Sequence, residues 1–214
     1  MGKVALGCLG VLVVFAAVAA LGGIGVYNRL TGLEQAVDAQ WSQVENVYQR
    51  RADLVPNLVA TVQGAADFEK STLQAVTEAR ASVGSVQAGS DVVNDPQAFA
   101  RFQAAQNALS GALSRLLVVV ERYPDLKANQ NFRDLQAQLE GTENRIAVER
   151  MRFNEAAQAY NTARLRFPTN MVANTFGFGP KAYFRAQAGA ERAPGVQFNF
   201  GASPSPVPAP TPQP

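Results

Sequence analysis

The stretch FRDLQAQLEGTENRIAVERMRFNEAAQAYNTARLRF, residues 132–167, decides the fold class. Within it, a set of residues that are mostly apolar recurs at alternating steps of three and four. This is the spacing of one face of an α-helix. A β-strand would instead need a period of two. The stretch therefore predicts one long amphipathic helix whose packing seam is formed by Phe132, Leu135, Leu139, Thr142, Ile146, Glu149, Phe153, Ala156, Tyr160, Ala163 and Phe167.

Two more segments with helical spacing lie on either side of Pro56. Residues 30–48 repeat apolar side chains at steps of three and four. Pro56 lacks a backbone N–H and disfavours helix at the residue before it, so we expect a break or sharp kink between Arg51 and Pro56. A second helix should follow and end near Gly84; its expected stripe is Leu58, Val62, Ala65, Glu69, Leu73, Val76 and Val83.

The sequence Asn94-Asp95-Pro96 predicts the start of another helix, because a capping residue is followed by proline in the first turn. That helix should stop at Tyr123-Pro124. Short connections between amphipathic helices force neighbouring helices to run antiparallel. We therefore predict an all-α fold in which an N-terminal transmembrane helix precedes an antiparallel up-and-down four-helix bundle over residues 27–184.

The N-terminal block from Val4 to Val26 carries no charge over 23 residues. As a helix it would be roughly 34 Å long, enough to cross a bilayer core of about 30 Å. Residues 1–26 are therefore predicted to be a transmembrane signal-anchor. A cleaved signal peptide is the alternative, since Ala17-Val18-Ala19 resembles a cleavage site, but the apolar run exceeds the usual signal core. A lipoprotein through Cys8 is disfavoured, because the apolar run continues well past that cysteine.

Orientation in the membrane is predicted from the flanking charges. Lys3 and the terminal amine precede the apolar block, and Arg29 follows it. The small excess on the N-terminal side places that end in the cytoplasm and the helical domain outside, by the positive-inside rule. The sequence thus predicts a single-pass protein of the cytoplasmic membrane, with the lipid bilayer as its first partner.

Composition excludes several functions. The chain has 19 basic and 17 acidic residues and no dense Lys/Arg cluster, so a nucleic-acid partner is not expected. It contains no histidine, which removes the commonest metal ligand and the usual form of a di-metal centre. With Cys8 as the single cysteine, no disulfide can form within the chain. We predict no catalytic, cofactor-binding or metal-binding residues, and no cofactor.

Several polar residues lie on or beside the apolar seams and are candidates for an internal ion pair. A buried charge needs a partner, so we expect Glu69 or Glu143 to pair with Arg150 or Arg51. The alternative is a carboxylate pair such as Glu140 and Glu143 acting in acid–base catalysis. The remaining candidates, which flank a seam or lie at helix ends, are Asn28, Asn57, Asn154 and Asn161. Trp41 fits either a packed seam or a partner surface.

The C-terminal part of the chain has a different composition. Residues 185–214 are irregular, and residues 203–214 contain six prolines. Such a tail cannot bury a core and is predicted to be disordered or extended. Residues 196–200 predict a short extended piece.

Several of these segments resemble the LemA family over roughly residues 3–184. The resembling residues are Tyr27-Asn28-Arg29-Leu30, Trp41-Ser42-Gln43-Val44, residues 50–59, Glu69, residues 121–127, Glu143, Ile146-Ala147, Arg150, Phe153-Asn154, Tyr160-Asn161 and Phe167-Pro168. The resemblance implies a bacterial membrane protein with one transmembrane helix and a helical bundle, without established enzyme activity or cofactor. It also implies membrane-protein neighbours such as an HtpX-like protease, and one branch of the family takes part in magnetosome formation.

These observations predict a membrane-anchored interaction or scaffolding protein of the bacterial envelope. It would bind an envelope protein or a second copy of itself rather than catalyse a reaction. Two alternatives remain open at this point: a hydrolase-like enzyme that uses acidic side chains of the bundle, and a secreted protein with a cleaved signal peptide.

Overall fold

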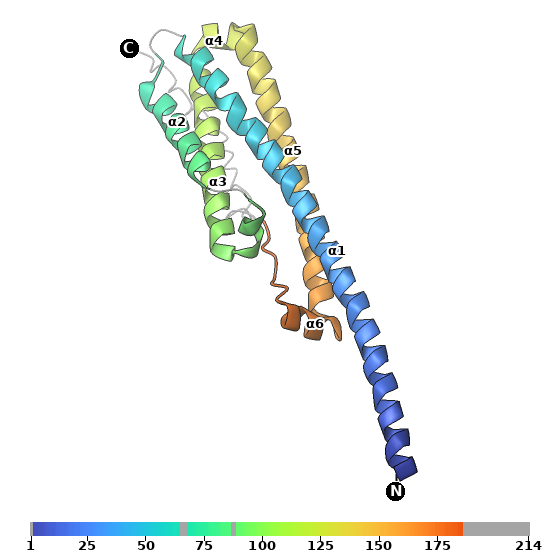
Figure 1. Ribbon diagram of the computed structural model, residues 1–214. Coiled ribbons are helices and arrows are strands. Elements are labelled where there is room, and N and C mark those ends of the chain that lie inside the picture. Colours follow the sequence, from blue (N-terminus) through green and yellow to red (C-terminus); the bar gives the residue numbers. More distant parts are fainter. Residues whose placement is uncertain (1, 65–67, 87–88, 186–214) are drawn as a thin grey trace, which may run out of the picture. The chain divides into compact units, whose positions relative to one another are not determined.

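The computed structural model describes residues 2–64, 68–86 and 89–185, and every regular element in these ranges is helical. The chain divides into two compact units, Met1–Phe184 and Arg185–Pro214. The helices of the described residues lie in the first unit (Figure 1), and they are α1 (Gly2–Gln63), α2 (Lys70–Ser85), η1 (Ser90–Asn94), α3 (Pro96–Val120), α4 (Pro124–Ala128), α5 (Gln130–Leu165) and α6 (Thr169–Phe176). The all-α class is confirmed for the described residues, whereas the tail and its extended piece at 196–200 lie outside them.

Helix α1 has an exposed apolar N-terminal part and a C-terminal part that packs into the core. Its N-terminal part is long and apolar enough to cross a membrane, and its large apolar side chains between Leu9 and Ile24 are exposed. Without interruption the same helix then carries the predicted core stripe, which is buried at Leu30, Val37, Trp41, Val44 and Tyr48. The apolar run and the core are therefore joined by continuous helix, with no linker between them.

The predicted break between Arg51 and Pro56 is wrong. Helix α1 continues through Pro56 to Gln63, and the ring of Pro56 is exposed. A proline in a helix leaves the carbonyl four residues earlier without its backbone donor. Here that carbonyl belongs to Ala52, and Arg80 of α2 donates Nε–H to it at 3.2 Å. A side chain from the neighbouring helix thus replaces the missing bond, so the helix tolerates the proline.

The boundaries of the second predicted helix are also corrected. Residues 58–63 belong to the end of α1, and α2 begins only at Lys70. Glu69 is therefore the N-cap residue of α2 rather than a member of its stripe, and its carboxylate accepts a hydrogen bond from Ser71 Oγ at 2.9 Å. Ala65 lies outside the described residues. The predicted end near Gly84 is confirmed, since α2 ends at Ser85.

The helix starts follow the capping rules. Asp95 Oδ1 accepts the backbone N–H of Gln97 at 2.8 Å, and Pro96 takes the first position of α3, as the sequence predicts. Asn129 caps α5 in the same way by accepting from the N–H groups of Asn131 and Phe132. The sequence missed the short helix α4 between α3 and α5, and it also missed α6.

The end of α5 corrects the last member of the predicted seam. The helix ends at Leu165, because Arg166 already has an extended backbone, with φ −74° and ψ 145°. Phe167 is therefore outside the helix, and 79% of it is exposed. Burial confirms most of the rest of the seam, namely Phe132, Leu139, Thr142, Ile146, Phe153, Tyr160 and Ala163. Leu135, Glu149 and Ala156 are half-buried, and Ala157 is buried in place of Ala156.

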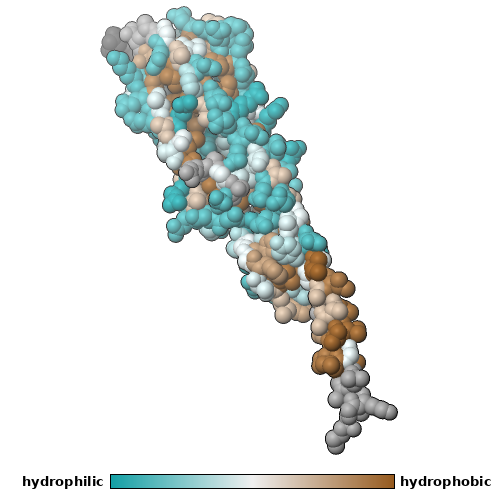
Figure 2. Space-filling model, in the orientation of Figure 1, coloured by the Kyte–Doolittle hydropathy of each residue, from teal (hydrophilic) through white to brown (hydrophobic). Residues whose placement is uncertain are grey.

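Two packing relations organise the first unit. Helix α1 packs along α5, and α2 packs against α3, as Figure 1 also shows. One hydrophobic cluster gathers around Trp41 of α1, Phe99 of α3 and Phe153 of α5. A second cluster, around Val62, Leu116 and Phe132, joins the end of α1 to α2, α3 and α5. On the face seen in Figure 2, hydrophilic side chains cover much of the surface over these helices.

The bond from Arg80 to the Ala52 carbonyl predicts an energetic coupling between Arg80 and Pro56. In the full-length protein, Arg80→Met should lower the free energy of unfolding by about 0.5–1 kcal/mol, since the carbonyl loses its donor. In a Pro56→Ala background the loss should shrink towards zero, because the new N–H at position 56 bonds to that carbonyl. Urea unfolding in detergent measures both, with Arg115→Met on α3 as an exposed control. An equal loss in the two backgrounds would contradict the proposed replacement.

Candidate functional site

The guanidinium of Arg51 is the most deeply buried charge among the described residues, with 1% of the residue exposed. Its Nη1 donates to Ser110 Oγ at 2.6 Å and to Glu143 Oε1 at 2.9 Å. Its Nη2 donates to the backbone oxygen and the side-chain oxygen of Gln106. The guanidinium carbon also lies 5.0 Å from the ring centroid of Tyr48. Arg51 therefore ties α1 to both α3 and α5 through charge-assisted bonds.

The predicted internal ion pair is thus confirmed for Arg51 and Glu143. Glu69 instead forms an exposed pair with Arg122 at 3.0 Å. The Arg150 guanidinium lies 4.6 Å from the ring centroid of Phe184. Arg51, Glu143 and Arg150 therefore lie together around Tyr48, to which Arg150 is hydrogen-bonded, whereas Glu69 lies apart at the start of α2.

Glu140 and Glu143, the candidate catalytic carboxylates, do line a common groove on α5 and α3 with a volume of about 420 Å³. Glu143 is held by the Arg51 guanidinium at 2.9 Å. Glu140 accepts a hydrogen bond from Gln136 one turn away on the exposed side of α5. An acid–base pair needs one carboxyl group that is free to carry a proton to the substrate, whereas Glu143 is committed to neutralising a buried cation.

A second polar arrangement involves the extended segment Phe178–Phe184, which we call the strap. Two asparagines of α5, Asn154 and Asn161, hold its backbone. Asn161 donates Nδ2–H to the carbonyl of Lys181 and accepts the N–H of Lys181, both at 2.9 Å. Asn154 makes the same pair of bonds to Phe184, at 3.0 and 2.9 Å. Two turns of helix separate the asparagines, so both amides lie on one face of α5. Each amide donates to and accepts from the backbone of the strap, as the backbone of a neighbouring β-strand would.

Further bonds fix the strap along its length. Arg164 Nε donates to the carbonyl of Phe178 at 2.6 Å, and the Tyr160 hydroxyl donates to that of Gly179 at 2.9 Å. The N–H of Ala182 donates to the carbonyl of Val93 in η1 at 3.1 Å. The strap therefore connects α5 with the turn that precedes α3.

Side chains of the strap enter the core. The Phe184 ring lies in an aromatic cluster, with its centroid 4.8 Å from that of Phe99 and 5.5 Å from that of Phe153. Trp41 belongs to the same cluster and is fully buried. Trp41 is therefore a packing residue. Its Nε1 donates to Glu45 Oε1 at 3.0 Å, while burial raises the pKa of the Glu45 carboxyl against the effect of that bond.

Lys181 of the strap is a second buried cation, with 3% of the residue exposed. Its Nζ donates to Glu34 Oε1 of α1 and to Asn94 Oδ1 of η1, both at 2.6 Å, and it lies 5.3 Å from the Tyr160 ring centroid. Burial raises the pKa of Tyr160 to about 12. Burial also raises the pKa of Asp38 nearby, and the positive charge of Lys181 opposes that shift.

The sequence reasoning missed Lys181 and the strap. A lone lysine in a stretch without periodicity gives no sign that it is buried. The usable signal was the spacing of Asn154 and Asn161, because two amides seven residues apart share a helix face beside an apolar seam.

No group of three or more His, Cys, Asp or Glu side chains that could hold a metal ion occurs in the part of the chain that the structure describes. Most of the polar residues discussed above instead hold one element to another. The fold and these contacts define a class of all-helical protein in which an apolar N-terminal helix continues into a domain cross-linked by buried polar side chains.

Comparison with known proteins identifies the family. The model of the LemA family matches residues 40–198, so the chain belongs to the LemA family and the resemblance seen in the sequence is confirmed. It is 28% identical over 176 residues to magnetosome protein MamQ of Magnetospirillum gryphiswaldense, covering 74% of this chain and 64% of MamQ. It is 24% identical over 163 residues to Protein LemA of Metamycoplasma hominis, covering 76% of this chain and 70% of that protein.

The chain spans less than two thirds of the length of the MamQ proteins that it matches. It covers 64% of MamQ of Magnetospirillum gryphiswaldense and 64% of MamQ 1 of Paramagnetospirillum magneticum. The names of these relatives include no enzymatic activity.

The buried pair predicts a strong and asymmetric effect on stability. Arg51→Met should lower the free energy of unfolding by about 3 kcal/mol, because it leaves the carboxylate and the polar groups of α3 without their donor. Glu143→Gln should cost only about 1 kcal/mol, since the amide oxygen still accepts and Glu143 is half-buried. Chemical unfolding followed by Trp41 fluorescence measures both. Glu140→Gln, on the exposed side of α5, is the control, and a similar effect of all three variants would refute a structural pair.

The asparagine contacts predict how firmly the strap is held. Asn154→Ala or Asn161→Ala removes two bonds to the strap and should increase amide hydrogen exchange in residues 178–184, with a loss of about 1–3 kcal/mol in unfolding free energy. Asn144→Ala, on the exposed face of the same helix, should leave the exchange unchanged. Unchanged protection of the strap in the first two variants would show that the asparagines do not hold it.

Proposed function

We propose that this chain is a membrane-anchored interaction or scaffolding protein of the bacterial envelope. The observation that carries this proposal is the use of the buried polar residues. Arg51 and Lys181 are the two buried cations of the described residues, and the hydrogen bonds that they make join α1 to α3 and α5 and join the strap to α1 and η1. Buried polar side chains that hold the elements of the domain together are not available for catalysis. This supports a protein that recruits a partner rather than one that catalyses a reaction. Hydrolysis by Glu140 and Glu143 is correspondingly disfavoured.

The proposed architecture combines the long apolar helix with an up-and-down four-helix bundle of α1, α2, α3 and α5. α1 would cross the cytoplasmic membrane once, with the bundle on the extracytoplasmic side as the charges around the apolar block favour. The likeness to magnetosome protein MamQ and to Protein LemA supports a common architecture.

The surface available for a partner includes large apolar side chains on the outside of the helices. Val118 of α3 is 70% exposed, and Met151 of α5 is 55% exposed. Such side chains are anchor points for protein contacts when a partner covers them. The partner would be another envelope protein or a second copy of this chain.

The first test is protease accessibility of the domain in intact spheroplasts, with mass spectrometry of the fragments. We expect cleavage from outside, while a fragment containing residues 1–26 remains in the membrane. Protection until lysis would place the domain in the cytoplasm. A mature chain that begins after residue 19 would instead show a cleaved signal peptide and overturn the anchor.

The second test concerns recruitment. A photo-reactive amino acid at Val118 or at Met151 in the full-length protein should give reproducible cross-links to one protein species in intact cells. Ser114, exposed on α3 one turn before Val118, provides a matched polar control position. Absence of any cross-linked product from both apolar positions, together with a strictly monomeric protein in detergent, would contradict the scaffolding role.

A further inference from the structure

The junction of α5 and α6 carries an apolar surface that neither the core nor the proposed partner surface explains. Four large apolar side chains within residues 165–176 are exposed to between 61% and 79%, namely Leu165, Phe167, Met171 and Phe176. On α2 to α5 before this junction, the exposed large apolar side chains are fewer: Val118 on α3, and the neighbours Val148 and Met151 on α5. A local concentration of this kind marks a contact with another apolar phase.

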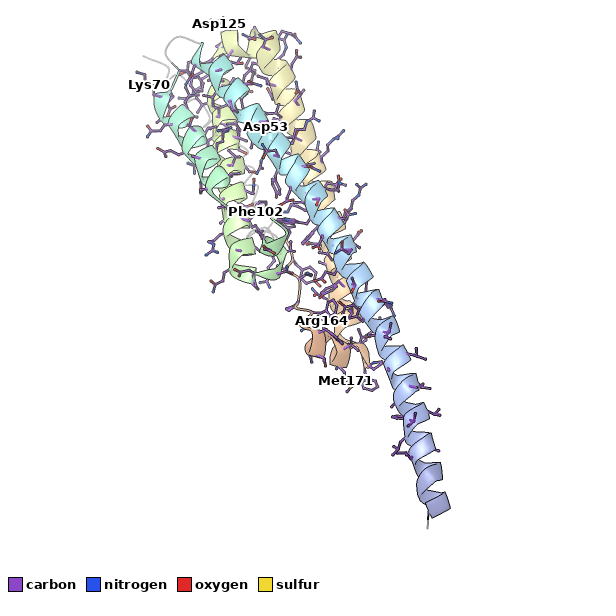
Figure 3. All side chains as sticks on the ribbon, viewed as in Figure 1. Asp53, Lys70, Phe102, Asp125, Arg164 and Met171 are labelled. Atoms are coloured by element: carbon purple, nitrogen blue, oxygen red, sulfur yellow. The ribbon has the colours of Figure 1, made fainter. Side chains whose placement is uncertain are left out.

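This surface lies beside the apolar part of α1. The Phe176 ring meets the Tyr27 ring edge to face, with centroids 5.1 Å apart. A groove of about 380 Å³ runs between them and is lined by Ala20, Gly23, Ile24, Tyr27 and Phe176. Figure 3 shows Met171 at the end of the helical domain from which the N-terminal part of α1 emerges. α6 is therefore level with the last turns of the apolar run.

The depth of the groove in a membrane follows from helix geometry. Ala20 precedes Val26, the last residue of the uncharged run, by six residues or about 9 Å of helix. If α1 spans the bilayer with residues 4–26 in the hydrocarbon core, Ala20 to Ile24 lie in the outer part of that core. Phe176, which lines the groove with them, then lies at the boundary between hydrocarbon and headgroups.

The charges around this surface suit the same boundary. Three arginines are close to it in the sequence: Arg29 follows Tyr27 on α1, and Arg164 and Arg166 flank Leu165 at the end of α5. Residues 156–185 contain no Asp or Glu. Arginine side chains place their stems along apolar surface and their guanidinium groups among lipid phosphates. Glu34 of α1, which faces the same end of α5, is paired with Lys181. The basic residues beside the apolar surface are complementary to an anionic bilayer.

We propose that residues 165–176, which we call the membrane cap, lie in the interfacial layer of the bilayer that α1 crosses. Phe167, Met171 and Phe176 contact acyl chains, and acyl chains fill the groove beside Ile24. The proposal rests on the membrane anchoring proposed above. The cap adds a second contact with lipid at a fixed distance from the span, because Tyr27 contacts both Phe176 and the Phe178 of the strap.

The test uses single cysteines in the full-length protein with Cys8→Ser. Met171→Cys in the cap, Asn144→Cys on α5 and Val14→Cys in the apolar run are each labelled with an environment-sensitive fluorophore. The protein is reconstituted in vesicles of phosphatidylcholine and phosphatidylglycerol, with and without brominated acyl chains. Position 144 is the control, because Asn144 is exposed and lies far from the cap along α5. Trp41 emission reports that each variant is folded.

We expect the label at position 171 to be blue-shifted and quenched by brominated lipid, and the label at 144 to be neither. Phe167→Cys should behave like Met171→Cys. If position 14 is quenched while 167 and 171 match 144, the cap lies in water and the proposal fails while the anchor stands. If position 14 is not quenched either, the anchoring itself fails. A blue shift at 171 without quenching would mean that protein, not lipid, covers the cap, which also overturns the proposal.

Discussion

The burial of the Arg51 guanidinium is the constraint on which the rest of the domain depends. A guanidinium carries a permanent charge, so removing it from water is costly unless acceptors surround it. Both Nη atoms of Arg51 find acceptors, while the buried Nε makes no hydrogen bond within the described residues. Those acceptors come from Gln106 and Ser110 of α3 and from Glu143 of α5. A shift of α5 by one residue would move Glu143 away from the guanidinium, and a shift of α3 would move Gln106 and Ser110 away from it. The apolar seams favour association of the helices, and Arg51 selects one register among the associations that the seams allow.

The strap applies the same principle at the other end of the core. Its segment has no helical period and could not hold its place by burial alone. Asn154 and Asn161 supply backbone partners from α5, Val93 supplies one from η1, and Lys181 finds Glu34 on α1. Once these bonds are made, Phe184 completes the aromatic cluster around Trp41. Buried polar bonds thus position a segment whose aromatic side chain then contributes the larger hydrophobic energy.

Much of this fold could be predicted from local sequence rules, and the failures share a cause. The seam of α5, the Asp95 cap and the helical class follow from periodicity and capping, which are properties of neighbouring residues. The break at Pro56 was wrong because the missing bond at Ala52 is replaced by Arg80, which lies 28 residues away in the sequence. Lys181 was missed because its partners lie on other elements. The pair of Arg51 and Glu143 was predicted only as one of several possible pairs, because a buried charge needs a partner but the sequence does not show which residue it is.

The continuity of α1 connects the register of the core with the orientation of the apolar run. Each residue of an α-helix advances about 100° around its axis, so the face that Arg51 and Trp41 turn toward α3 and α5 determines which face of residues 20–27 meets α6. A flexible linker would separate the two, and none is present between Val26 and Leu30. The buried guanidinium therefore influences more than the stability of the core. Through an unbroken helix it determines where Tyr27 meets Phe176, and with that contact the position of the domain relative to the apolar segment.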